Sequence, residues 1–124
     1  MTSSGPLVSV VDDDQSVRES LPDLLNAFGF RAKTFPSAED FLSSGSIVET
    51  KCLILDLAMP GMTGLELHYE LQRQGQSIPT IFITAHKDET MRPRLIEQGA
   101  VDCLFKPFSD TALQGALGSA FASD

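Results

Sequence analysis

Residues 52–64 read CLILDLAMPGMTG, an apolar run that ends in one aspartate and a proline–glycine turn. The run at 52–55 is short and continuous, which is typical of a strand buried on both faces of a sheet. Pro60 and Gly61 predict a loop directly after it. A lone carboxylate, Asp56, at the end of such a strand costs free energy unless other groups interact with it. The rest of the chain must therefore supply partners for Asp56.

Similar apolar runs recur along the chain, with helix-like segments between them. They lie at 7–11, 32–35, 80–83 and 101–105. Alternating strands and helices predict an α/β domain whose parallel sheet is covered on both faces. Around the second run, residues 31–35 read RAKTF, in which Arg31 and Lys33 alternate with other residues and point one way, which predicts an edge strand. Right-handed crossovers that reverse once then give the strand order 2-1-3-4-5, a doubly wound, flavodoxin-like fold with five helices.

Helix-terminal residues support five helices in the intervening segments. Gly29 and Gly75 predict two C-terminal stops, and Ser37 predicts an N-cap. Pro22 removes one amide donor from the first helix, so we expect a kink or a late start there. Pro93 suits the first turn of the fourth helix. The five segments are 15–30, 37–42, 65–75, 89–100 and 109–121.

Length and charge restrict the class of protein. The chain has 124 residues, 42% of them hydrophobic, so we expect a short arm at 1–5 and a single domain at 6–124. The net charge of −8 argues against direct nucleic-acid binding, which needs a basic face. The sequence has no apolar run long enough for a membrane span and no signal-peptide pattern, so a cytoplasmic location is expected. Cys52 and Cys103 lie in apolar runs, which predicts buried, reduced thiols.

Polar side chains gather where the predicted strands end. Asp12 and Asp13 follow the first strand, Asp56 follows the third, and Thr84 and Lys106 follow the fourth and fifth. The carboxyl ends of parallel strands form one ligand-binding edge. Crowded carboxylates repel one another unless a cation intervenes, and oxygen ligands of this kind favour Mg²⁺. A metal, a lysine and a hydroxyl around Asp56 suit phosphoryl transfer to its carboxylate, with Asp56 as nucleophile.

Four segments, VVDDD, DLAMPGMTG, FITAH and LFKPF, resemble in order and spacing the receiver domain of bacterial two-component response regulators. The similarity covers essentially the whole chain and is closest to receivers of the LuxR-type, nitrogen-fixation class of regulators. It implies that Asp56 is the phosphoacceptor, that Thr84 is the switch hydroxyl, and that Lys106 contacts the phosphate. It also implies a cis bond between Lys106 and Pro107.

The same resemblance implies a metal site and its ligands. In the family pattern Mg²⁺ is held by Asp13, Asp56 and the main-chain carbonyl of Ala58. Asp12 matches the acidic residue that holds metal-bound water. The AMPG turn is expected to aim the Ala58 carbonyl toward the metal.

One position departs from the family pattern, and two others lie where the family varies the rate of dephosphorylation. Cys103 stands where the family has a switch aromatic, which predicts weaker coupling between Thr84 and the surface of the fourth helix and fifth strand. Ala58 and His86 occupy the two positions that tune dephosphorylation, and the small Ala58 predicts moderately quick phosphate loss. We expect His86 to be a loop residue and His68 to be exposed and without function.

The resemblance also implies partners. A sensor histidine kinase is expected to supply the phosphate, and the fourth helix, fifth strand and fifth helix form the family's usual homodimer face. A transcription output domain outside this chain is the expected effector. The kinase should dock on the first helix and nearby loops, at Ser16, Glu19, Ser20, Asp23, Asp14 and Pro107.

Other functions remain open at this point. An aspartyl-phosphate hydrolase of the haloacid dehalogenase type would need a second acid two residues after Asp56, where this chain has Ala58. A phosphate-independent docking module would retain the pocket without using it. A nucleotide-binding domain would need a glycine-rich loop after the first strand, where this chain has acids. The leading interpretation is a signalling domain and not a metabolic enzyme.

Overall fold

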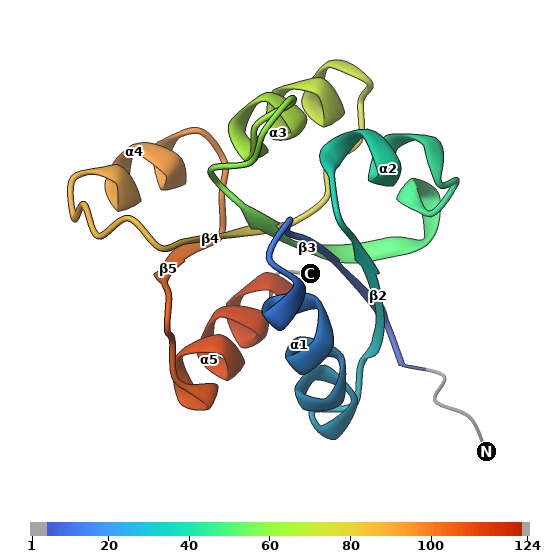
Figure 1. The fold of residues 1–124 in the computed structure, drawn as a ribbon, viewed down its shortest axis with the longest axis vertical. Helices are drawn as coiled ribbons and strands as arrows, with labels where there is room; N and C mark the ends of the chain where they lie inside the picture. Colours follow the sequence, from blue (N-terminus) through green and yellow to red (C-terminus); the bar gives the residue numbers. More distant parts are fainter. Residues whose placement is uncertain (1–4, 123–124) are drawn as a thin grey trace.

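Five short apolar segments form one parallel sheet in the computed structural model, which describes residues 5–122. Figure 1 shows the sheet at the centre of the molecule. Its order is β2-β1-β3-β4-β5, and every neighbouring pair is parallel, so the predicted fold class and order are confirmed. Most of the arm expected at 1–5, and the end of the domain expected at 6–124, lie outside the described residues. The strands are β1 (Leu7–Val11), β2 (Arg31–Phe35), β3 (Thr50–Asp56), β4 (Thr80–Thr84) and β5 (Asp102–Phe105).

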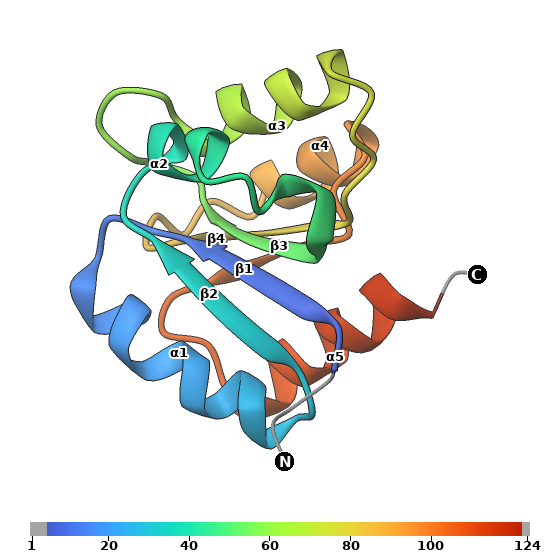
Figure 2. The same cartoon turned by 90° about the vertical axis from the view of Figure 1, so that its right-hand side faces the viewer.

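Helices cover both faces of the sheet, as Figures 1 and 2 show. Two of them, α1 (Gln15–Ala27) and α5 (Asp110–Phe121), lie on one face. On the other face lie α2 (Ala38–Ser43), α3 (Gly64–Arg73) and α4 (Met91–Glu97). Side chains alternate along each strand, so two apolar cores form, one beneath each helical layer. Among residues 5–122, no helix combines the length and the apolar character that crossing a bilayer requires.

The helix ends follow the predicted signals, with one exception. Gly29 and Gly75 have positive φ angles of 96° and 79°, which glycine adopts without strain. Ser37 accepts a hydrogen bond from the Asp40 amide as an N-cap, and Pro93 lies in the first turn of α4. The alternative of a late start caused by Pro22 is wrong, since α1 begins at Gln15 and runs through the proline. Burial of Leu21 and Leu25 on the sheet outweighs one missing backbone hydrogen bond.

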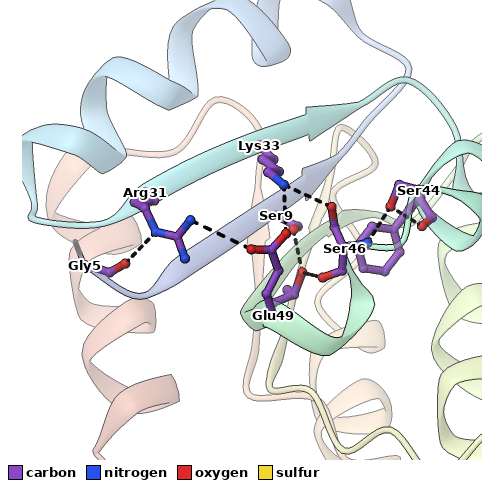
Figure 3. A network of polar contacts seen from close by, with 9 residues as sticks. Gly5, Ser9, Arg31, Lys33, Ser44, Ser46 and Glu49 are labelled. Atoms are coloured by element: carbon purple, nitrogen blue, oxygen red, sulfur yellow. Dashed lines mark hydrogen bonds and ion pairs between the residues drawn. The ribbon is translucent and has the colours of Figure 1, made fainter. Parts of the chain in front are cut away.

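Strand β2 is the predicted edge strand, and its cations join a polar network at the sheet margin (Figure 3). Lys33 Nζ lies 2.8 Å from Glu49 Oε2, and Arg31 Nη1 lies 3.9 Å from Glu49 Oε1. Glu49 ends a short 3₁₀ helix, η1 (Ile47–Glu49), which the sequence reasoning did not predict. The hydrogen bond and charge of Lys33 lower the pKa of Glu49. These charged side chains lie along the edge strand β2, and charge at a sheet edge disfavours pairing with a strand of another molecule.

His68 is buried, so the expectation that it is exposed is wrong. Its residue is 4% exposed, and its ring packs edge-on against Phe82, with centroids 5.4 Å apart. The buried residues of α3 are Gly64, Leu67, His68 and Leu71, the spacing of one helical stripe. Burial lowers the pKa of His68, and its Nδ1 has no hydrogen-bond partner in the part of the chain that the structure describes.

Replacing His68 with leucine should reduce the loss of stability in mild acid. Because burial lowers the folded-state pKa, the unfolded chain binds more protons as the pH falls below about 6.5, and wild-type stability decreases. One such group contributes at most about 1.4 kcal/mol per pH unit. Urea unfolding at about pH 7.5 and about pH 5.5 measures the effect, since other groups titrating in this range are common to both proteins. Exposed His86→Gln is the control, and equal pH dependence in wild type and His68→Leu would contradict the prediction.

Candidate functional site

Three carboxylates converge at the carboxyl edge of the sheet. Asp12 and Asp13 follow β1, and Asp56 is the last residue of β3. One carboxylate oxygen from each lies within 4.8 Å of the other two. Asp12 and Asp56 are buried, at 0% and 5% exposure, whereas Asp13 is exposed. The predicted cluster is therefore present, with one side open to solvent.

Lys106 brings a positive charge to this cluster from the end of β5. Its Nζ lies 2.8 Å from Asp12 Oδ2 and 3.8 Å from Asp56 Oδ2. Burial acts to lower the pKa of Lys106, but the hydrogen bond and charge of Asp12, with the charge of Asp56, leave it raised. Lys106 therefore stays protonated and holds the buried Asp12 as an ion pair. The bond between Lys106 and Pro107 is cis, as the resemblance implied.

Asp56 lies in an electrostatically unfavourable position. Burial, together with the hydrogen bond and negative charge of Asp12, raises the pKa of Asp56 to about 7. Lys106 and the Ala58 amide, which lies 3.4 Å from Asp56 Oδ1, act in the opposite direction but do not cancel the effect. One ammonium group does not balance three carboxylates at this distance. The cluster is therefore short of positive charge.

The donor set fits a hard divalent cation. All three acidic side chains offer oxygen, the ligand type that Mg²⁺ and Ca²⁺ prefer. Asp12 and Asp56 are held in place by burial, and exposed Asp13 leaves a path from solvent. A cation here would relieve the repulsion that raises the pKa of Asp56.

Thr84 places a hydroxyl at the end of β4. The residue is 2% exposed, and its Oγ1 accepts a hydrogen bond from the His86 amide at 3.1 Å. The Thr84 carbonyl accepts a hydrogen bond from the Lys106 amide at 2.8 Å, which ties the ends of β4 and β5 together. His86 lies in the loop after β4, as predicted, and it is exposed.

The position beside Thr84 in the sheet is occupied by an aromatic residue that the sequence reasoning did not single out. Phe105 is the register partner of Thr84, and Cys103 is the partner of Phe82. Cys103 and Cys52 are both buried free thiols, as predicted. Burial raises the pKa of Cys52 to about 12, and burial with the charge of Asp102 raises that of Cys103. The register between the fourth and fifth strands is the signal that would have identified Phe105 as the neighbour of Thr84.

A pocket of about 880 Å³ adjoins the site between α1 and the start of α5. Lys106 lines one part of it, and the apolar side chains of Val17, Leu24 and Phe108 line another. It includes four of the six residues expected to form a kinase-docking face, and Ser16 and Glu19 are exposed nearby on α1. The four are Asp14, Ser20, Asp23 and Pro107.

Comparisons with known proteins identify the family of this chain. Residues 8–118 match the sequence profile of the response regulator receiver domain. Nodulation protein W of Bradyrhizobium diazoefficiens is 43% identical over 122 residues, which cover 98% of this chain and 54% of that protein. Transcriptional regulatory protein FixJ of Rhizobium meliloti is 42% identical over 110 residues, which cover 89% of this chain and 54% of that protein. The chain thus spans about half the length of these relatives.

A solved structure extends the likeness to three dimensions. The crystal structure of FixJ-N superimposes with a TM-score of 0.80 at 40% identity, covering 92% of this chain and 91% of that one. The family profile covers both the acidic cluster at the end of β1 and the lysine at the end of β5. This chain therefore belongs to the receiver domain family of two-component response regulators, which are signalling domains.

Proposed function

We propose that this domain accepts a phosphoryl group on Asp56 from a sensor histidine kinase. The observation that carries the proposal is the convergence of Asp12, Asp13 and Asp56 with Lys106 Nζ at one edge of the sheet. A structural ion pair needs only one carboxylate and one amine. This cluster instead has three carboxylates beside one amine, with Asp56 at the end of β3 among them. Such a surplus suits a cation and a transferred phosphoryl group.

The residues of the site have complementary roles in the proposed transfer. A carboxylate oxygen of Asp56 forms a bond to phosphorus as the bond between phosphorus and the donor's imidazole nitrogen breaks, and the imidazole leaves. Lys106, held by Asp12, neutralises charge on the phosphoryl oxygens. The Thr84 hydroxyl donates a hydrogen bond to one of these oxygens after transfer. Ionised Asp56 needs no general base.

Asp13, Asp56 and the Ala58 carbonyl would hold Mg²⁺, with buried Asp12 orienting its water. When bound, Mg²⁺ supplies positive charge to the transferring group. The oxygen-only donor set and the repulsion among the carboxylates support this assignment.

We further infer the partners and context of the domain. The pocket between α1 and α5 lies beside Lys106, which supports kinase docking there. The face formed by α4, β5 and α5 is the proposed homodimer surface. Relatives named transcriptional regulators are about twice as long as this chain. We therefore infer that a transcription output domain regulates transcription, and that this domain does not itself bind nucleic acid. We place this signalling in the cytoplasm. The family match does not favour a haloacid-dehalogenase-like hydrolase or a phosphate-independent docking module.

Acetyl phosphate and Mg²⁺ should add one phosphoryl mass to the wild-type domain. Asp56→Ala should gain none, since it lacks the nucleophile, and Lys106→Ala should be labelled much more slowly. Intact-protein mass spectrometry measures the labelling, and Asp40→Ala, an exposed acid on α2, should label like wild type. Labelling of Asp56→Ala to the wild-type extent would refute the proposal.

Mg²⁺ should stabilise the wild-type fold more than it stabilises variants of its ligands. At ten times the dissociation constant, binding adds about 1.4 kcal/mol to the free energy of unfolding. Asp13→Asn and Asp56→Asn should gain much less, because each loses a charged ligand. Urea unfolding with MgCl₂, against NaCl of equal ionic strength, tests this. Equal gains in all three proteins would count against a cation at the cluster.

Ala58→Arg should slow the loss of phosphate from Asp56 several-fold. Ala58 is exposed two residues after Asp56, and its methyl group does not screen a phosphoryl group from water. A long side chain there would hinder the attacking water. The rate of loss is followed by mass spectrometry after the phosphodonor is removed. Ala58→Ser, which adds little bulk, should retain the wild-type rate; an unchanged rate in Ala58→Arg would rule out shielding.

A further inference from the structure

A side chain from α2 holds the tip of the loop that joins β3 to α3. Glu39 Oε2 accepts a hydrogen bond from the Met62 amide at 3.1 Å. The same carboxylate lies against Gly61, where an added Cβ would be 2.9 Å from Glu39 Oε2. Gly61 also has a φ of 73°, which disfavours other residues. The loop tip and the Glu39 carboxylate are therefore fitted to one another.

The backbone that carries Glu39 is fixed. Its neighbour Ala38 and Phe41, two residues further along α2, are both 0% exposed. The Phe41 ring packs edge-on against Phe35 of β2, with centroids 5.2 Å apart. Ser37 Oγ accepts a hydrogen bond from the Asp40 amide at 3.0 Å and defines the start of α2. Glu39 thus reaches the loop from a rigid base.

The other end of the loop is fixed by the sheet. The Leu57 amide donates to the Ile83 carbonyl at 2.9 Å, and the Gly64 amide donates to the Leu57 carbonyl at 3.2 Å. Met59 is 6% exposed within the core beneath α2 and α3. Ala58 lies between Leu57 and Met59, and its amide is 3.4 Å from Asp56 Oδ1. Its backbone therefore belongs to a segment anchored by the sheet on one side and by Glu39 on the other.

We propose that Glu39 is a positioning residue for the cation site. By holding the loop tip, it fixes the backbone at Ala58 in the orientation that lets this residue and Asp56 share one cation. This inference rests on the proposed function above. Glu39 acts through the hydrogen bond to Met62, because the segment between that bond and Asp56 is short and closed. Its carboxylate contacts the loop tip at Gly61 and Met62, and it is not one of the proposed ligands or reacting groups.

Variants of Glu39 can separate the positioning role, which depends on the hydrogen bond to Met62, from a simple effect of the negative charge. A carboxylate anywhere near the cluster attracts cations through its charge. Glu39→Gln removes the charge but keeps an oxygen that can accept the Met62 hydrogen bond. Glu39→Ala removes both, and Asp40→Ala removes an exposed negative charge from the next residue of α2.

The test is a Mg²⁺ titration of wild type and these three variants, followed by backbone amide shifts in NMR. Glu39→Ala should weaken Mg²⁺ binding by up to about tenfold, the low end for a residue outside the ligand shell. Glu39→Gln and Asp40→Ala should stay within about twofold of wild type, since an exposed charge is screened. In metal-free protein, the Met62 amide should exchange with solvent faster in Glu39→Ala alone. Equal urea midpoints for Glu39→Ala and Asp40→Ala show that the fold is retained.

The outcomes distinguish this inference from the proposed function. If wild type binds Mg²⁺ and Glu39→Ala binds it equally well, Glu39 does not position the site. If Glu39→Gln is as weak as Glu39→Ala, charge and not the hydrogen bond is responsible, and the inference is overturned. If wild type binds no Mg²⁺ at all, the proposed function itself fails.

Discussion

The site depends on a buried ion pair between Lys106 and Asp12. Lys106 Nζ lies 2.8 Å from Asp12 Oδ2, and Asp12 is completely buried. Removing charges from water costs free energy that offsets much of their attraction, and well-packed apolar side chains in place of a buried ion pair are often as stable or more stable. Asp56 beside them adds a second buried carboxylate with a raised pKa. The buried carboxylates are explained by a site that binds positive charge. The buried apolar strands around the site stabilise the fold and offset the free energy that burying these charges costs.

The sheet supplies that support because its central strands are buried on both faces. All five residues of β1 and all five of β4 are buried, as are six of the seven in β3. From β1 the chain connects to β2 on one side, and it then crosses to β3 on the other side of β1. In a doubly wound sheet, such a change in the side of connection opens a crevice, which here lies between β1 and β3. Asp12 and Asp56 leave the sheet on either side of that crevice. Fold topology, more than any local motif, brings the two carboxylates together.

Most of the fold could be predicted from the sequence because the signals for its strands and helix ends are local, and the meeting of the site carboxylates then follows from the strand order. Apolar runs locate the five strands, and the bounds of β1 agree with the prediction residue for residue. The prediction that His68 is exposed is wrong, although its burial has a local signal: with Gly64, Leu67 and Leu71 it completes one helical stripe. The hydrogen bond from Met62 to Glu39 could not be found this way, because it joins residues 23 positions apart. Local patterns identify which residues are buried, whereas contacts between loops and helices need the packed structure.

Backbone hydrogen bonds explain why the site residues are well placed while the loops around them are exposed. The Asp12 amide donates to the Phe35 carbonyl, and the Lys106 amide donates to the Thr84 carbonyl, so each residue is tied to a neighbouring strand as it leaves the sheet. Ala58 and His86, each two residues after the end of β3 or β4, are exposed. Segments with few buried contacts open at lower free energy than the sheet does. We expect rearrangement after the proposed phosphorylation to begin in the exposed loop after β4, while the strands keep the charged groups in register.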